Sequence, residues 1–199
     1  MIRLVLVLAL ALATTGARAE EGAAVKGTIT AGPAPGTPVA DAVVLVDGPS
    51  VPAPPDAPHA TIDQRNESFV PHVIAIAVGT TVDFPNHDPV LHNVYAASPA
   101  KHFDLGMYGE GESRSVLFDK AGVVRVGCNV HPKMEAFVIV HTNPWAAVTD
   151  AHGAYTITGV PPGHYTVRVW HESRGAREVP ITLRAGEVLP LDLRLEPAH

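Results

Sequence analysis

Nineteen prolines and seventeen glycines interrupt this 199-residue chain every few residues, which leaves little room for a long regular element. The segments between them are short, rich in β-branched residues, and mostly alternate apolar with polar or small residues, as strands do. We find no convincing apolar face at helical spacing over twelve residues. We therefore predict an all-β protein, with at most a short helix near 97–103 and strands at 25–30, 41–46, 73–78, 80–84, 92–95, 114–118, 123–126, 136–140, 154–158, 165–170, 180–183 and 189–195.

The first nineteen residues have the pattern of a secretory signal peptide. Arg3 precedes the apolar run 4–13, and the sequence ARA at 17–19 follows as a small-residue cleavage site. A membrane anchor is the alternative, but this apolar run is too short to span a bilayer, which takes about 20 residues. We expect cleavage after Ala19, export to the periplasm, and a mature chain, 20–199, that does not insert into a membrane.

Charge and cysteine content narrow the range of functions. Cleavage removes two arginines, which leaves 12 basic against 20 acidic residues and a net charge of −8. A net anion is not attracted to nucleic acid or to anionic membranes, so neither is expected as a partner. Cys128 is the single cysteine, and an exported thiol is a liability unless it is buried, paired with another chain or bound to a metal.

Two breaks divide the chain into three parts. The proline-rich stretch 48–60 is typical of a stiff linker, and the sequence TNPW at 142–145 marks the second break. The middle part, 61–141, has about seven predicted strands, enough for a sandwich, whereas the first part, 20–60, has too few to be stable alone. We therefore expect the first part and the last, 142–199, to form one sandwich, with the middle domain inserted between their strands.

The two outer parts carry the motifs of a known domain. The sequences VKGTITAGPAPGTPVADAVVLV, from Val25, and AVTDAHGAYTITGVPPGHYTVRVWHE, from Ala147, resemble the carboxypeptidase regulatory-like (transthyretin-like) domain. This resemblance implies a Greek-key sandwich. Within it, we expect Gly153 to allow a tight hairpin and the sequence PPG at 161–163 to fix a turn before the strand 165–170.

The middle part contains the residue types of a mononuclear copper site. The stretch GCNVHPKM places Cys128 at the end of a predicted strand, with His131 and Met134 following at intervals of three residues. His92 lies on a distant predicted strand. Two histidines and one cysteine in a trigonal set, with a weak axial methionine, hold copper for electron transfer. We predict that one copper ion binds to His92, Cys128, His131 and Met134.

Each of these residues also has a purely structural interpretation. Cys128 could be a small buried residue, Met134 could pack in the core without binding metal, and His87 could be the ligand in place of His92. The polar neighbours of His87 in the same loop are expected to cap turns rather than bind metal: Asn86 and Asp88. A chance C-x-x-H is unsurprising among eleven histidines, but the ordered set of four ligand types is hard to obtain by chance.

The middle part resembles the cupredoxins of the plastocyanin, amicyanin and pseudoazurin group. The loop CNVHPKM matches their short pattern C-x-x-H-P-x-M, PVLHNVY matches the upstream histidine motif, and VGTTVDFPNHD matches the strand before it. One departure is Val130, where amicyanin and plastocyanin usually have proline. The resemblance implies a sandwich fold and a role for Asn93 in tying the two ligand loops together. The pairing of the two domains also resembles periplasmic proteins of methylamine utilisation.

These features favour an exported type 1 copper protein that acts as an electron carrier. The alternative is a copper-binding or delivery protein, although delivery proteins commonly use several exposed methionines and the mature chain has only two. An enzyme is not expected, because the chain lacks C-x₃-C, H-x-H, G-x-S-x-G and H-E-x-x-H motifs. The expected partner is a redox protein that docks on the loop around His131, through Val130, Pro132 and Lys133.

Overall fold

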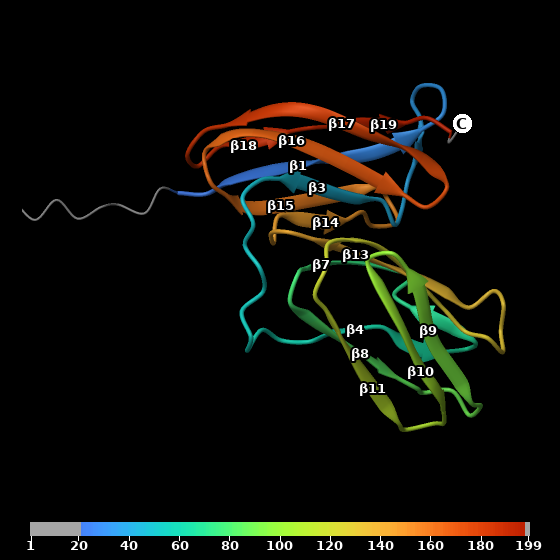
Figure 1. Cartoon of the computed structure of the whole chain (residues 1–199). Coiled ribbons are helices and arrows are strands. Elements are labelled where there is room, and N and C mark those ends of the chain that lie inside the picture. Colours follow the sequence, from blue (N-terminus) through green and yellow to red (C-terminus); the bar gives the residue numbers. More distant parts are fainter. Residues whose placement is uncertain (1–20, 198–199) are drawn as a thin grey trace, which may run out of the picture.

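The computed structural model describes residues 21–197, so the predicted signal peptide, 1–19, lies outside the described residues. Every regular element in the described range is a strand, which confirms the all-β prediction. Figure 1 shows these strands gathered into two units, one above the other. Within the same range, the chain forms no helix with the length and apolar character needed to cross a membrane.

The upper unit in Figure 1 joins strands from both ends of the described chain. In its first sheet, β1 (Ala23–Ala31) pairs with four other strands: β2 (Thr37–Pro38), β15 (Ala154–Val160), β18 (Val188–Pro190) and β19 (Leu193–Leu195). The second sheet has the order β14 (Ala146–Val148), β3 (Val43–Asp47), β16 (Gly163–His171) and β17 (Arg174–Leu183). Apolar side chains from both sheets form one core, among them Ile29, Val44, Ile157 and Val167.

The lower unit is built from the middle of the chain. Its larger sheet has the order β10 (Lys101–Tyr108), β9 (His92–Ser98), β12 (Gly122–Gly127), β13 (Glu135–His141) and β7 (Val73–Ala77). The smaller sheet has the order β11 (Ser113–Phe118), β8 (Thr80–Pro85) and β4 (Ala60–Thr61). A separate hairpin consists of β5 (Asp63–Arg65) and β6 (Ser68–Val70). The core between the two sheets includes Phe84, Phe118, Val126 and Val138.

No helix forms near 97–103, where the prediction allowed at most a short one: β9 and β10 form a tight hairpin there, in which Ser98 pairs with Lys101. One local prediction is wrong. The turn at Gly153 is not a hairpin, since β14 and β15 belong to different sheets. Glycine is still required there: φ is +72°, and a Cβ would lie 2.3 Å from the carbonyl oxygen of Ile29.

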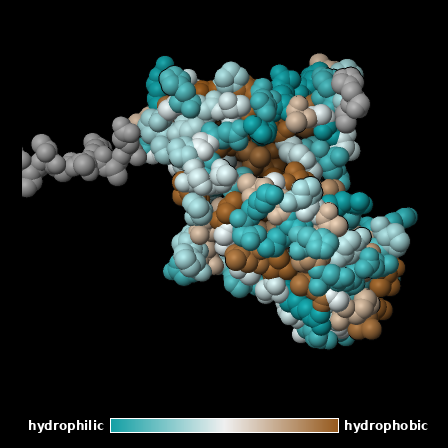
Figure 2. Space-filling model, in the orientation of Figure 1, coloured by the Kyte–Doolittle hydropathy of each residue, from teal (hydrophilic) through white to brown (hydrophobic). Residues whose placement is uncertain are grey.

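An apolar cluster joins the two units. Its buried members come from β3, β7 and β13: Val43, Val73 and Ile139. The rings of Phe137 and Trp170 lie 5.3 Å apart across the junction, and Nε2 of His72 lies 3.1 Å from a carboxylate oxygen of Glu172. Figure 2 shows apolar surface on both units near this junction. The strand that leads away from the Cys128 loop therefore packs directly against the other unit.

Candidate metal centre

The site lies where two neighbouring strands and one loop meet. His92 is the first residue of β9, Cys128 directly follows β12, and His131 lies in the loop between β12 and β13. Because β9 and β12 are antiparallel, with Tyr95 paired to Gly127, the end of β12 lies beside the start of β9. Sheet pairing therefore brings together two ligand candidates that are 36 positions apart in the chain.

Hydrogen bonds hold the loop between β12 and β13 in a closed form. The Cys128 amide donates to the carbonyl of Met134 at 3.2 Å, and the Met134 amide donates to the carbonyl of His131 at 2.9 Å. The Asn129 amide donates to Oδ1 of Asn93 at 3.4 Å, which links this loop to the start of β9. The positions of the candidate ligands are thus set by the backbone as well as by side-chain packing.

Three possible ligand atoms converge in this geometry. Nδ1 of His92 and Nδ1 of His131 are 3.1 Å apart, and the Cys128 sulfur is 4.0 Å from Nδ1 of His92. All three ligand atoms lie within 4.8 Å of one another. Imidazole nitrogens bind metal ions at about 2.0–2.1 Å, so one ion fits between two nitrogens at this separation. A thiolate beside two imidazoles is a donor set that suits copper.

Asp88 contacts Nε2 of His92, the outer ring nitrogen, which faces away from the other candidate ligands. Its carboxylate is buried and accepts a hydrogen bond from Nε2 of His92 at 2.7 Å. It also accepts the backbone amides of Asn66 and Glu67, at 2.5 and 2.8 Å. Burial alone would raise the pKa of Asp88, but the hydrogen bonds from Glu67, His92 and Asn66 outweigh it and lower that pKa below its ordinary value. With the proton on Nε2, the lone pair of Nδ1 is free to face the site.

The contact between Asp88 and His92 was not predicted from the sequence. Asp88 was expected only to cap a turn, and the loop does contain such a cap, because Oδ1 of Asn86 accepts the amide of Asp88 at 2.8 Å. The signal available in the sequence was a carboxylate four residues before His92, but this spacing alone does not fix the direction of the side chain. The alternative ligand His87 is bonded elsewhere, with Nδ1 2.6 Å from a carboxylate oxygen of Asp63.

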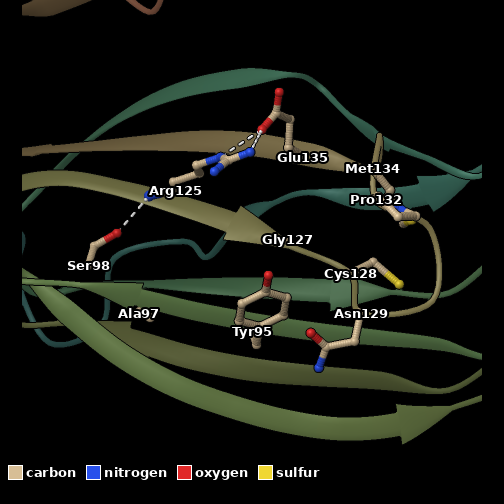
Figure 3. A pocket seen from close by; sticks show the side chains of 10 residues that line it. All are labelled: Tyr95, Ala97, Ser98, Arg125, Gly127, Cys128, Asn129, Pro132, Met134 and Glu135. Carbon is tan, nitrogen blue, oxygen red and sulfur yellow. Dashed lines mark hydrogen bonds and ion pairs between the residues drawn. The ribbon is translucent and has the colours of Figure 1, made fainter.

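Met134 is buried in the same core cluster as Cys128. Both residues line a cavity of about 460 Å³ beside the site, drawn in Figure 3. The ring of Tyr95 covers Gly127 in this cavity, and a Cβ at position 127 would lie 3.1 Å from that ring. The other lining residues are Ala97, Ser98, Arg125, Asn129, Pro132 and Glu135.

The residues expected to contact a partner lie at the surface. Val130 is 49% exposed, and Pro132 and Lys133 are also exposed. His131, between them, is partly exposed, with 24% of its side chain accessible, whereas His92 is fully buried. Among the three clustered residues, His131 is therefore the one that reaches the surface.

One family model matches part of the chain. Residues 121–196 match the carboxypeptidase regulatory-like domain, which confirms the predicted resemblance to that family. The matched stretch begins in the lower unit, because it includes β12 and β13, and continues through the last strands of the upper unit. No curated protein matches the chain.

Solved structures that are similar to part of the chain include copper proteins. A copper-containing nitrite reductase (NirK) from Thermus scotoductus SA-01 is 27% identical over 44% of this chain and 23% of its own, with a TM-score of 0.42. The alignment thus spans less than a quarter of that enzyme. A purple cupredoxin from Nitrosopumilus maritimus is 28% identical over 41% of this chain and 99% of its own, with a TM-score of 0.38.

Amicyanin is also similar to part of the chain. A Cu(I) form of a mutant amicyanin is 20% identical over 49% of this chain and 98% of its own, with a TM-score of 0.40. Cupredoxins are therefore among the similar structures, as the sequence motifs predicted. Because these similarities are low, copper is assigned from the donor atoms of the site itself.

Proposed function

We propose that this chain is an exported electron carrier that would hold one copper ion through His92, Cys128 and His131, with Met134 as a weaker fourth ligand. The observation that carries the proposal is the convergence of two imidazole nitrogens and one thiol sulfur within 4.8 Å. Sulfur ligands favour Cu(I) and imidazole suits both oxidation states, so this donor set supports both. Copper bound there would supply a one-electron couple.

The protein's own part in this function is to keep the ligands in place. His92 and Cys128 are buried, and the loop that carries His131 is closed by backbone hydrogen bonds. Ligands fixed in this way change position little between the two oxidation states, which favours rapid electron exchange. A delivery protein would instead benefit from ligands that open and release the ion.

Electrons would leave through His131, because its imidazole is the exposed one of the three clustered side chains. The exposed residues around it, Val130 and Pro132, offer a small apolar contact, and small contacts are typical of transient electron-transfer encounters. Lys133 adds a positive charge on a mature chain of net charge −8, which would steer an acidic redox partner to this loop. Export to the periplasm is part of the proposal and rests on the signal-like sequence 1–19.

A redox titration of the copper-loaded protein tests this function. An electron carrier should pass reversibly between Cu(II) and Cu(I) over repeated cycles, whereas a copper holder should strongly favour one state. Docking is tested with the anionic oxidant hexacyanoferrate(III), whose reaction rate should fall in the Lys133→Glu variant with an unchanged copper spectrum. Lys120→Glu is the matched control, because it makes the same change of charge away from the site. The Lys120 side chain donates a hydrogen bond to the carbonyl of Pro99, just beyond the end of β9 that is opposite His92. Equal rates in the two variants would show that Lys133 does not contribute to docking.

A further inference from the structure

The hairpin of β5 and β6 has an unusual residue in its turn. Asn66 and Glu67 form the two-residue loop between the strands, and both have a φ of +53°. Turns with two positive φ angles favour asparagine followed by glycine. A glutamate in the second position adopts a conformation that side chains disfavour, so its presence calls for a compensating interaction.

The backbone of this turn is bound to the carboxylate of Asp88. The amides of Asn66 and Glu67 donate to its two oxygens at 2.5 and 2.8 Å. The oxygen that accepts from Glu67 also accepts from Nε2 of His92 at 2.7 Å. The turn is therefore connected to the first histidine of the metal site through a single buried carboxylate.

The side chain of Glu67 extends to the second histidine. One of its carboxylate oxygens lies 3.9 Å from Nε2 of His131, with 64% of the Glu67 side chain exposed. Each histidine thus has a carboxylate near its outer nitrogen, while the inner Nδ1 atoms face each other at 3.1 Å. The two carboxylates belong to residues that are themselves hydrogen-bonded to each other, since Asp88 accepts the Glu67 amide.

We propose that Asp88 and Glu67 form a bracket of two carboxylates around the histidines of the metal site, in which Asp88 positions His92 and both negative charges lower the reduction potential. The inference rests on the copper site proposed above. A carboxylate on the outer nitrogen of a histidine fixes the ring orientation and makes the imidazole a stronger donor. Stronger donors and nearby negative charge stabilise Cu(II) more than Cu(I). In this account Glu67 occupies the turn because its carboxylate, which glycine lacks, places a negative charge near His131.

A purely structural role for the hairpin makes a different prediction. If Asp88 only stabilises the turn, then its replacement lowers the stability of the fold without changing the copper potential. If Glu67 is only a poor turn residue, then Glu67→Gly raises the unfolding temperature and changes nothing else. The bracket predicts that Glu67→Gly raises both the unfolding temperature and the reduction potential.

The experiment compares Asp88→Asn, Glu67→Gln and Glu67→Gly with the control Glu110→Gln. Glu110 is exposed in a neighbouring loop, and among the described residues no hydrogen bond or ion pair of its side chain is found. Glu110→Gln therefore removes the same charge as Glu67→Gln without removing a contact. Each variant is loaded with copper, and its potential and its affinity for Cu(II) are measured.

We expect Asp88→Asn to weaken Cu(II) binding by about 10–100-fold, the usual effect of losing such a partner. Each tenfold loss that Cu(I) does not share raises the potential by about 59 mV. The Glu67 variants should shift the potential in the same direction but less, because that carboxylate is exposed and more distant from its histidine. Glu110→Gln should leave it unchanged. Potentials of Asp88→Asn and both Glu67 variants equal to that of Glu110→Gln would overturn the proposal.

One measurement needs neither a variant nor copper. In metal-free protein, the Nε2 proton of His92 should give a nuclear magnetic resonance signal that is shifted downfield and exchanges slowly, because Asp88 holds it in a buried site. A rapidly exchanging proton, or a proton on Nδ1, would overturn the bracket even if Asp88→Asn fails to fold. Failure of copper to bind would reject the proposed function while leaving this hydrogen bond measurable.

Discussion

Nδ1 of His92 and Nδ1 of His131 lie 3.1 Å apart, although the two residues are 39 positions apart in the chain. The pairing of β9 with β12 and the closed loop after Cys128 produce this approach. With the proton of His92 on Nε2, its Nδ1 can accept a hydrogen bond from the Nδ1–H group of His131, and a bound metal ion would take the place of that shared proton. The fold thus holds two donor nitrogens in position for one ion.

Met134→Leu tests the axial ligand. Leucine is similar in volume to methionine, so we expect a change in the free energy of unfolding of less than about 1.5 kcal/mol. Copper should remain bound, and the reduction potential should rise, because loss of the axial sulfur destabilises Cu(II) more than Cu(I). Potentiometry of the purified variant measures this. An unchanged potential would mean that Met134, which is buried in the core, only packs there.

Ile139→Ala tests the junction between the two units. Ile139 is buried in the apolar cluster that joins them, and replacing such a residue with alanine typically costs about 2–5 kcal/mol. Calorimetry should show a lower unfolding temperature and a separation of the transitions of the two units. Leu117→Ala, at an exposed position on β11, is the control and should change stability by less than about 0.5 kcal/mol. If the two variants behave alike, the cluster does not hold the units together.

The segment 142–199 should not fold when it is produced alone. Its strands pair with β1 and β3, which come from the first part of the chain, and its core is completed by Ile29 and Val44. Without these strands, the sheets lose inner members and expose apolar surface. Circular dichroism and proteolysis of the isolated segment measure this, with the mixture of 142–199 and a peptide of 21–47 as the comparison. A stable isolated segment would argue against a sandwich shared by the two ends.

Stability should fall as pH drops from about 6.5 to about 4, because of His141. Burial lowers the pKa of His141 to about 4, against its ordinary value of 6.5, although its hydrogen bond with Asn143 and the charge of Asp47 act in the opposite direction. Between these two values the unfolded chain binds a proton that the folded chain does not. The contribution of His141 is thus present above pH 6.5 and is lost as pH falls, at no more than about 1.4 kcal/mol per pH unit.

His141→Gln should reduce this pH dependence. Denaturant titrations at several pH values between 4 and 7 give the free energy of unfolding for the variant and the unmodified protein. Burial also lowers the pKa of His171, so a smaller slope of the same sign should remain in the variant. A slope that is identical with and without His141 would show that its protonation is not linked to folding.

The sequence was most informative where the chemistry is local. The spacing of Cys128 and His131 within one loop, and the motif around His92, were sufficient to predict the three residues that the structure brings together. The strand pattern predicted the all-β class for the same reason, since alternation and turn residues act over a few positions. The distant partner His92 was identifiable because its motif places it at the start of a strand.

The bracket around the histidines was not predictable in this way. It depends on the short hairpin of β5 and β6, whose polar residues, such as Asp63 and Arg65, do not form an alternating apolar pattern. It also depends on the direction in which Asp88 points, which is fixed by two backbone amides from the turn. Contacts between a loop and a distant turn arise from the tertiary fold, and a single sequence contains no local signal for them.

The visible absorption spectrum of the copper-loaded protein tests the central claim most directly. With one copper ion bound by His92, Cys128 and His131, we predict an intense visible band from charge transfer between the Cys128 sulfur and Cu(II). The band should saturate at one copper per chain and disappear in Cys128→Ser. A protein that binds zinc but gives no coloured copper form, or that keeps the band without Cys128, would contradict the account.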